Sequence, residues 1–151
     1  MATDRGFTVR KLGEIAIRCA DIAAMEAFYR DIIGLPILSG SHSDGIVFFN
    51  LGESHGGHTS VLALFQHDAP QRAVHPEAPV APITGAGSSL HHLALAVDAS
   101  EQDAVIAWYD VQGMDYRIED FPWIGWRGIF TTDPEGNTVE LVAKVAEPSG
   151  S

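Results

Sequence analysis

The feature that most restricts the fold of this chain is an internal duplication. Residues of matching type or matching role recur after a nearly constant interval of 77 to 80 positions. The pairs are Glu14 and His92 at 78 positions, Phe28-Tyr29 and Trp108-Tyr109 at 80, Gly34 and Gly113 at 79, and Ala63 and Glu140 at 77. An interval this regular indicates that one structural unit occurs twice.

The first copy predicts a strand, a helix and three further strands. Residues 14–19 alternate between two faces, as a half-buried strand does, and Asp21 is a suitable N-cap for the helix after it. That helix is expected over residues 22–33, because apolar side chains recur there at three- and four-residue steps, and Gly34 ends it. The strands that follow are expected at residues 36–38, 45–51 and 60–66.

The second copy repeats this order. A strand is expected at residues 90–97, with His92 and the two alanines after it on one face. A helix capped by Asp98 or Ser100 and extending through Val111 comes next. Three strands complete the copy, at residues 114–118, 127–132 and 137–143.

One carboxylate interrupts the last of these strands. The turn Asp133-Pro134-Glu135-Gly136 leads into an apolar, β-branched run, and Glu140 lies in the middle of that run. A carboxylate directed from a strand toward a buried face is costly unless a metal ion, a substrate or a basic side chain pairs with it. Glu140 is therefore the first candidate functional residue.

Together the copies predict an α+β protein made of two tandem βαβββ modules. Each module has one helix for four strands, so the helix covers one face of the sheet and the other face is available to line a cleft. We expect a single domain over residues 1–151, with module one at about 10–67, a Pro- and Gly-rich connector at 68–89, and module two at about 90–145. The strands should be mostly antiparallel and form a cupped sheet around the cleft.

The composition restricts the possible partners and location. The formal net charge of -11 at pH 7 argues against binding to nucleic acid or to an anionic membrane surface. The single cysteine, Cys19, cannot form a disulfide within the chain, which favours a cytoplasmic location. The predicted cleft suits a small-molecule substrate. The long connector lets the modules pair within one chain or across two chains, and we expect a homodimer.

Short motifs recur at matching places in both halves. They are Asp21, Ala27-Phe28-Tyr29-Arg30-Asp31 and Gly34-Leu35 in the first half, and His91-His92-Leu93-Ala94, Asp133-Pro134-Glu135-Gly136-Asn137 and Glu140-Leu141 in the second. With these motifs the chain resembles the vicinal oxygen chelate superfamily, which includes glyoxalase I, extradiol dioxygenases and the bleomycin resistance proteins. The resemblance covers nearly the whole chain and implies the paired-module fold, but this fold hosts many reactions.

The resemblance also implies where a metal ion would be held. In this superfamily the ligands come from the first and last strands of each module, and the matching positions here are Glu14, Ala63, His92 and Glu140. Ala63 cannot bind a metal, and Glu14 stands where three-ligand members have a histidine. Glu14, His92 and Glu140 would then form an oxygen-rich site for a divalent ion, which could be Fe, Mn, Ni, Co or Zn. Glu140 or Glu14 would act as the catalytic base.

Each candidate residue also has a plain structural interpretation. Glu14 could pair with Arg18 on the same strand face, and His92 could be an interior histidine with its hydrogen bonds satisfied. An aromatic loop in the second half either walls an apolar substrate pocket or makes ordinary core or dimer contacts. The aromatic residues of this loop are Phe121, Trp123 and Trp126.

Three functions remain open on these grounds. The first is a glyoxalase-like, metal-dependent enzyme of lyase, isomerase or dioxygenase type that chelates a small oxygenated substrate. The alternative is a protein that sequesters a ligand without a metal, as the resemblance to bleomycin resistance proteins implies. The third is a regulatory module that keeps the fold and has lost the site.

Overall fold

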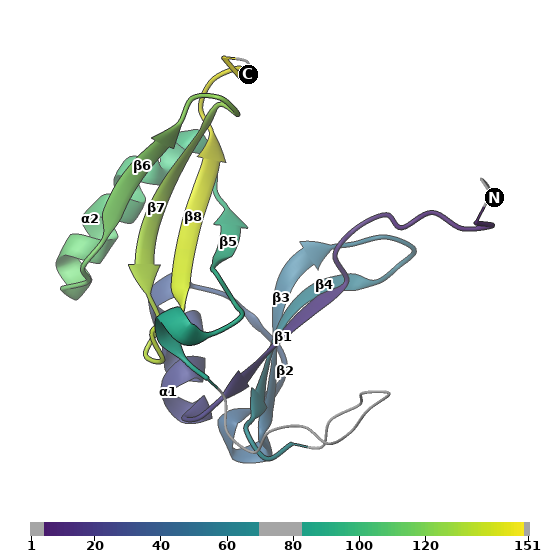
Figure 1. The fold of residues 1–151 in the computed structure, drawn as a ribbon. Helices are drawn as coiled ribbons and strands as arrows, with labels where there is room; N and C mark the ends of the chain where they lie inside the picture. The colour runs from purple at the N-terminus through teal and green to yellow at the C-terminus, as the bar shows by residue number, and fades with distance from the viewer. Residues whose placement is uncertain (1–4, 70–82, 150–151) are drawn as a thin grey trace. The chain divides into compact units, whose positions relative to one another are not determined.

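Two units make up the computed structural model, which describes residues 5–69 and 83–149 of the chain. The first unit is Met1–Ala81 and the second is Pro82–Ser151. Each contains a four-stranded mixed sheet and a principal helix in the order βαβββ, which confirms the predicted α+β class (Figure 1). Most of the predicted connector falls on residues 70–82, which lie outside the described residues.

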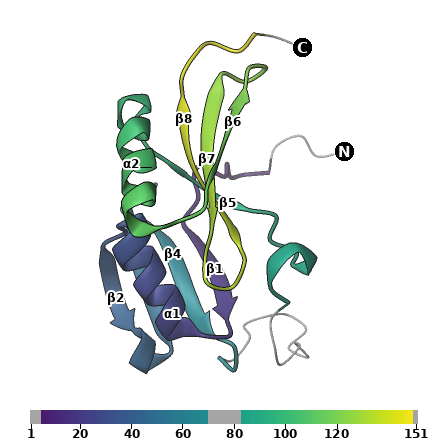
Figure 2. The same cartoon turned by 90° about the vertical axis from the view of Figure 1, so that its left-hand side faces the viewer.

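The sheet of the first unit has the strand order β1-β4-β3-β2. Strands β1 and β4 are parallel, and the other neighbouring pairs are antiparallel. The helix α1 follows β1 and contacts β4 (Figure 2). The bounds of these elements are β1 (Glu14–Cys19), α1 (Ile22–Ala27), β2 (Ile37–Ser41), β3 (Ile46–Glu53) and β4 (Thr59–Gln66).

The first helix begins where the sequence predicts but changes form before its end. The Asp21 carboxylate caps α1 by accepting a hydrogen bond from the backbone N–H of Ala24 at 3.1 Å. The chain then continues as a π-helix, η1 (Phe28–Ile33), which ends at Gly34 with a φ of 88°. Neighbouring residues are rotated less about the axis of a π-helix than about that of an α-helix. The consecutive side chains Phe28 and Tyr29 are both buried.

The sheet of the second unit has the equivalent order, β5-β8-β7-β6. Strands β5 and β8 are parallel, and the other neighbouring pairs are antiparallel. A short 3-10 turn leads into α2, and there Asp98 and Glu101 form a capping box. The bounds are β5 (Leu93–Ala96), α2 (Gln102–Gln112), β6 (Arg117–Phe121), β7 (Trp126–Thr132) and β8 (Thr138–Lys144).

Strand β5 is shorter than the strand predicted over residues 90–97. Its ladder with β8 begins with Leu93 opposite Val139. β8 itself begins only one residue before Val139, so the ladder extends little further toward the N-terminus of β5. His92 therefore lies immediately before the strand rather than inside it.

The two sheets have matching registers at their central strands. Ala16 of β1 lies opposite Ala63 of β4. In the second unit, Ala94 of β5 lies opposite Glu140 of β8. Ala63 and Glu140 therefore hold equivalent positions in the two units, and only the second unit has a carboxylate there.

Each unit buries its own apolar core. In the first unit the side chains with no exposed surface include Met25, Tyr29, Phe49 and Leu62, and in the second they include Tyr109, Ile129 and Val139. These residues come from the helix and from alternate positions of the central strands, as a sheet covered by a helix on one face requires. No helix within the described ranges combines the length and the apolar character needed to cross a membrane.

Candidate functional site

The turn that leads into β8 is held by its first residue. One carboxylate oxygen of Asp133, Oδ1, accepts hydrogen bonds from the backbone N–H groups of Glu135 at 2.9 Å and Asn137 at 3.0 Å. The other, Oδ2, accepts a hydrogen bond from the Asn137 side chain at 2.9 Å. Gly136 has a φ of 80°, a left-handed conformation that favours glycine. The chain therefore enters β8 in a well-defined conformation.

Glu140 lies on β8, which is flanked on both sides by other strands of the second sheet. Its exposed fraction is only 4%. Its neighbours Val139 and Leu141 are buried on the opposite face, as the alternation of a strand requires. The carboxylate is therefore held within the sheet surface instead of extending into water.

His92 reaches Glu140 from the segment before β5. The distance between His92 Nε2 and Glu140 Oε1 is 3.3 Å. The other ring nitrogen of His92, Nδ1, lies 2.7 Å from Nδ1 of His91, so one of these two nitrogens donates a hydrogen bond to the other. When a neutral His92 is the donor, its Nε2 presents a lone pair toward Glu140; when it is the acceptor, its Nε2 presents an N–H. His92 can thus act either as a ligand or as a hydrogen-bond donor.

The surroundings of Glu140 change its acidity. Burial raises the pKa of this carboxyl group, because the charged form loses hydration. The neighbouring His92 acts in the opposite direction, and the carboxylate of Glu119 adds to the increase in pKa. A carboxylate whose pKa is raised is a stronger base than an ordinary glutamate once it is ionised.

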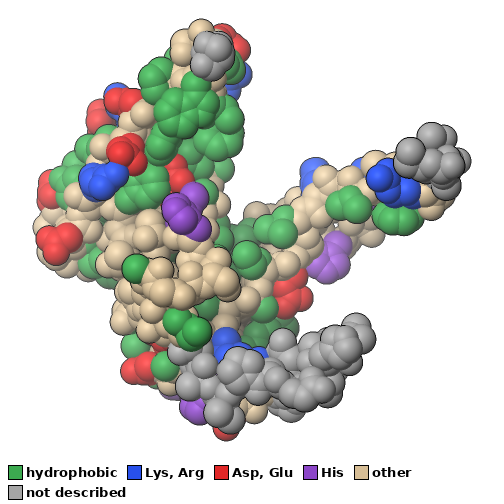
Figure 3. All heavy atoms as spheres, viewed as in Figure 1, with side chains coloured by type: hydrophobic (Ala, Val, Ile, Leu, Met, Phe, Trp, Pro, Cys, Tyr) green, Lys and Arg blue, Asp and Glu red, His purple; other side chains and the backbone are tan. Residues whose placement is uncertain are grey.

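His92 and Glu140 lie in the wall of a cavity of about 770 Å³ in the second unit. Four aromatic side chains line it, namely Phe121, Trp123, Trp126 and Phe130. Phe121 ends β6 and lies opposite Trp126, the first residue of β7, so these rings belong to one hairpin. Phe121 also makes an edge-on contact with Trp123, at a distance of 5.3 Å between ring centroids. Hydrophobic side chains gather around this hairpin on the surface of the unit (Figure 3).

Several further lining residues were not predicted from the sequence, among them His91, Glu119 and Phe130. The alternation of β6 contains a signal for Glu119, since it lies two residues before Phe121 and shares its face. The Glu119 carboxylate accepts a hydrogen bond from Nη2 of Arg117 at 2.6 Å. The lining residues of this cavity include two carboxylates and four Phe or Trp rings, and no lysine or arginine.

Glu14, the third predicted metal ligand, belongs to the first unit. It is the first residue of β1, is exposed, and lies opposite Val61 of β4. On the same strand, the guanidinium of Arg18 donates to the backbone carbonyl of His67. The participation of Glu14 in one site with His92 and Glu140 stays a prediction.

The donor atoms of the second unit can be tested for their fit to a metal ion. Among residues 5–69 and 83–149, no three side chains of His, Cys, Asp or Glu are gathered closely enough to hold one. Nitrogen and oxygen ligands about 2.0 to 2.2 Å from one ion lie roughly 3 Å apart. The separation of 3.3 Å between His92 Nε2 and Glu140 Oε1 is compatible with that arrangement. The pair therefore fits as two ligands of one ion, and a third ligand has to come from elsewhere.

Comparisons with known proteins identify the family. The model of the Glyoxalase/Bleomycin resistance protein/Dioxygenase superfamily matches residues 11–141, and the chain belongs to this superfamily. The resemblance drawn from the sequence motifs is thereby confirmed. No curated protein sequence matches the chain significantly.

Several solved structures share the fold over most of their length. A lactoylglutathione lyase from Agrobacterium tumefaciens is 24% identical with a TM-score of 0.59, covering 87% of this chain and 92% of that one. A glyoxalase/bleomycin resistance protein/dioxygenase from Nocardioides is 20% identical with a TM-score of 0.65, covering 96% and 91%. A glyoxalase/dioxygenase from Nostoc punctiforme is 22% identical with a TM-score of 0.64, covering 97% and 98%. These identities establish a common fold, and the reaction has to be argued from the site.

Proposed function

We propose that this chain is a glyoxalase-like, metal-dependent enzyme that binds a small oxygenated substrate beside His92 and Glu140. The observation that carries this proposal is the approach of Glu140 Oε1 to His92 Nε2, at 3.3 Å, in the wall of an aromatic cavity. A buried carboxylate in an apolar strand needs a partner, and an exposed imidazole alone satisfies it only in part. A shared metal ion would satisfy both groups.

The proposed metal site consists of Glu14, His92 and Glu140. The ion would be Fe, Mn, Ni, Co or Zn, since one imidazole and two carboxylates suit all of these. When bound, such an ion polarises a substrate oxygen as a Lewis acid. Glu140 is the preferred proton acceptor, because burial raises the pKa of its carboxyl group, and Glu14 is the second candidate.

The cavity supports a substrate with an apolar part next to its oxygen atoms. The rings of Phe121, Trp123 and Trp126 would cover the apolar part, while the oxygens lie beside His92 and Glu140. One structural relative is by name a lactoylglutathione lyase, so a lyase, isomerase or dioxygenase reaction is proposed for this chain. Because the chain has a single cysteine, which cannot form a disulfide within the chain, we place this activity in the cytoplasm.

Metal analysis of protein purified without added metal tests the proposal. We expect the wild-type chain to retain a divalent ion, and His92→Ala, Glu140→Ala and Glu14→Ala to lose it. Removing even an outer partner of a metal ligand costs about 10- to 100-fold in affinity, so removing a ligand should cost at least as much. The control is Glu119→Ala, which removes a carboxylate from the same cavity that is not a proposed ligand. Equal metal content in the wild type, His92→Ala and Glu140→Ala would end the proposal.

A second candidate function is sequestration of a ligand without a metal. Two observations favour it: the described residues contain no ready three-ligand cluster, and four aromatic rings line the cavity. In addition, Ala63 holds the position equivalent to Glu140 and cannot bind a metal, so one ligand of the four-ligand family pattern is missing. In this alternative, His92 and Glu140 would bind the ligand by hydrogen bonds.

Tryptophan fluorescence separates the two functions. The Trp108→Phe variant leaves Trp123 and Trp126, which both line the cavity, as the only tryptophans of the chain. Catechol, with two vicinal oxygens, and phenol, with one, form a matched pair of probes. If a bound metal chelates the substrate, catechol should quench the fluorescence much more strongly than phenol, and EDTA should abolish the difference. Equal quenching by both probes, unchanged by EDTA, would favour sequestration.

A further inference from the structure

The Glu140 carboxylate lies against Gly128, which has no side chain. In the ladder between β7 and β8, Phe130 lies opposite Glu140 and Gly128 lies opposite Val142. A Cβ atom placed on Gly128 would lie 2.8 Å from Glu140 Cδ, and closer still to its Oε2. It would also lie 2.8 Å from Cε2 of Phe130. The space that a side chain at position 128 would fill is therefore already occupied by the Glu140 carboxylate.

The backbone does not explain this glycine. Many glycines of the chain have positive φ angles, which side chains disfavour, but Gly128 is not one of them. It lies in the middle of β7, where a glycine is a poor strand former because it has no side chain to pack. We therefore attribute the glycine at position 128 to the space that it leaves beside Glu140.

The first unit shows what occupies the same place when the carboxylate is missing. There Phe48 lies opposite Ala63, and Ile46 lies opposite Phe65. By register, Phe48 corresponds to Phe130, Ala63 to Glu140, and Ile46 to Gly128. The same strand pair thus contains glycine with glutamate in one unit and isoleucine with alanine in the other. The fold itself accepts a large side chain at this position, and the glycine accompanies the carboxylate.

We propose that Gly128 is a positioning residue of the candidate site. Because Gly128 has no side chain, it leaves the space in which the Glu140 carboxylate lies, 3.3 Å from His92 Nε2. Any side chain at position 128 displaces the carboxylate and separates these two groups. The proposal rests on the proposed function only for its effect on metal binding, since the steric coupling between Gly128 and Glu140 is independent of any metal.

A double-mutant cycle in EDTA measures this coupling. Gly128→Ala is introduced into the wild type, into Glu140→Gln, which keeps the size of the side chain, and into Glu140→Ala, which removes it. We expect Gly128→Ala to lower Tm by about 5 °C or more in the first two backgrounds, and by less than half as much in the third. The control is Gly87→Ala, whose added Cβ makes only an ordinary contact of 3.5 Å with Ile83. An equal loss of Tm in the wild-type and Glu140→Ala backgrounds would overturn the proposal.

Titration with Co(II), followed by the visible absorption of the bound ion, measures the consequence for the site. Gly128→Ala should bind Co(II) about 10- to 100-fold more weakly than the wild type and with a changed spectrum, while Gly87→Ala should match the wild type. If the wild type binds Co(II) and Gly128→Ala binds it equally well with the same spectrum, the positioning role is wrong. If the wild type binds no Co(II), the proposed function fails, and the cycle in EDTA still decides the role of Gly128.

Discussion

At Glu140, two opposing physical effects act on the charge of the carboxylate. Burial within the sheet disfavours its charge, and the imidazole of His92 stabilises that charge from one side only. The net result is a raised pKa, so the loss of hydration outweighs the attraction. Such a residue lowers the stability of the fold, as functional carboxylates often do.

This balance predicts how stability depends on pH at residue 140. Because the pKa of Glu140 is higher in the folded chain than the ordinary value of 4.5, the folded state binds its proton more tightly, and stability falls as the pH rises above about 4.5. Glu140→Gln removes this penalty and should raise the free energy of unfolding of the metal-free protein by about 0.5 to 2 kcal/mol at pH 7. Urea unfolding at pH 7 and pH 4 checks it, since the gain should shrink at the lower pH. If Glu140→Gln were less stable than the wild type at pH 7, the contacts of the charged carboxylate would outweigh its loss of hydration, and the prediction would be wrong.

At the residue scale, the sequence indicates a candidate residue where its environment can be read along the chain. Glu140 stands out because its strand is otherwise apolar, and the aromatic residues 121, 123 and 126 stand out as a cluster. The contribution of His91 to the cavity depends on the course of the segment before β5, and Gly128 looks like any other glycine in the sequence. Its role depends on a neighbour in another strand.

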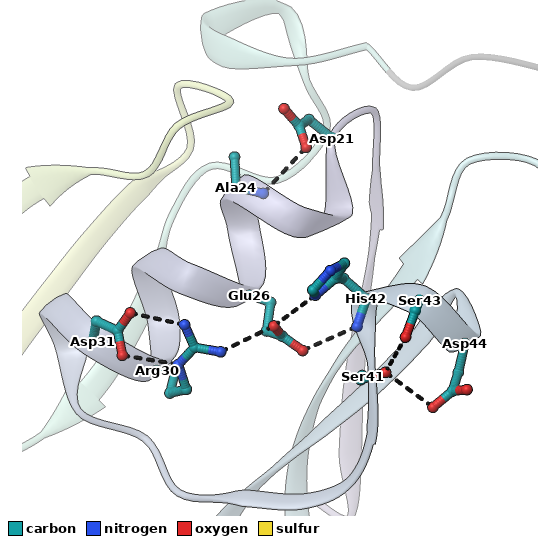
Figure 4. Close-up of polar contacts among 9 residues, drawn as sticks. All are labelled: Asp21, Ala24, Glu26, Arg30, Asp31, Ser41, His42, Ser43 and Asp44. Carbon is teal, nitrogen blue, oxygen red and sulfur yellow. Dashed lines mark hydrogen bonds and ion pairs between the residues drawn. The ribbon is translucent and has the colours of Figure 1, made fainter.

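At the scale of elements, a buried carboxylate joins the first helix to the turn after β2. Glu26 of α1 is only 3% exposed. Its carboxylate accepts hydrogen bonds from Nη1 of Arg30 at 3.0 Å and from the backbone N–H of His42 at 2.9 Å, and it lies 2.9 Å from Nδ1 of the His42 ring. Figure 4 shows Glu26 between these two residues. His42 therefore holds the turn against the helix.

The Glu26 contacts predict a loss of stability when the charge is removed. Burial acts to raise the pKa of Glu26, but the hydrogen bonds from His42, together with the charges of His42 and Arg30, hold it below the ordinary value of 4.5. Glu26→Gln should therefore lower the free energy of unfolding by about 1.5 to 3 kcal/mol at pH 7, because an amide cannot accept all of these hydrogen bonds. The loss should diminish as the pH falls below about 4.5, where the wild-type carboxylate becomes protonated.

The matched control is Asp31→Asn, which affects the other partner of Arg30. Asp31 is exposed, and its ion pair with Arg30 lies on the surface. Exposed pairs contribute about 0 to 1 kcal/mol, so this variant should unfold almost like the wild type. Urea unfolding of both variants checks the comparison, and equal losses would mean that the contacts of Glu26 with the turn add nothing.

At the scale of the whole molecule, the duplicated units lead us to expect that the chain forms an oligomer. Each unit is a sheet with one principal helix, so the opposite face of each sheet is available to a second unit. We expect a homodimer, and light scattering after size-exclusion chromatography should give twice the mass of 16.2 kDa. A monomer would contradict the expectation.

Co-refolding two variants that each lack one proposed metal ligand tests whether the proposed site is formed within one chain or between two chains. Glu14→Ala and Glu140→Ala each lack one proposed ligand, and each should bind metal weakly alone. If the units pair between chains, mixed dimers contain one intact site and metal binding returns. If they pair within a chain, every site keeps a defect, and the mixture binds no better than its components.

The sequence by itself determined the duplicated α+β modules, their order of elements and most of their ends. These features follow from hydrophobic periodicity, caps and turn glycines, which act over a few neighbouring residues. Only the tertiary structure decided that His92 Nε2 meets Glu140 Oε1, that Glu26 reaches His42, and that Gly128 leaves the space for the carboxylate. Those contacts depend on how strands and turns far apart in the chain are brought side by side, and local sequence preferences carry little of that information.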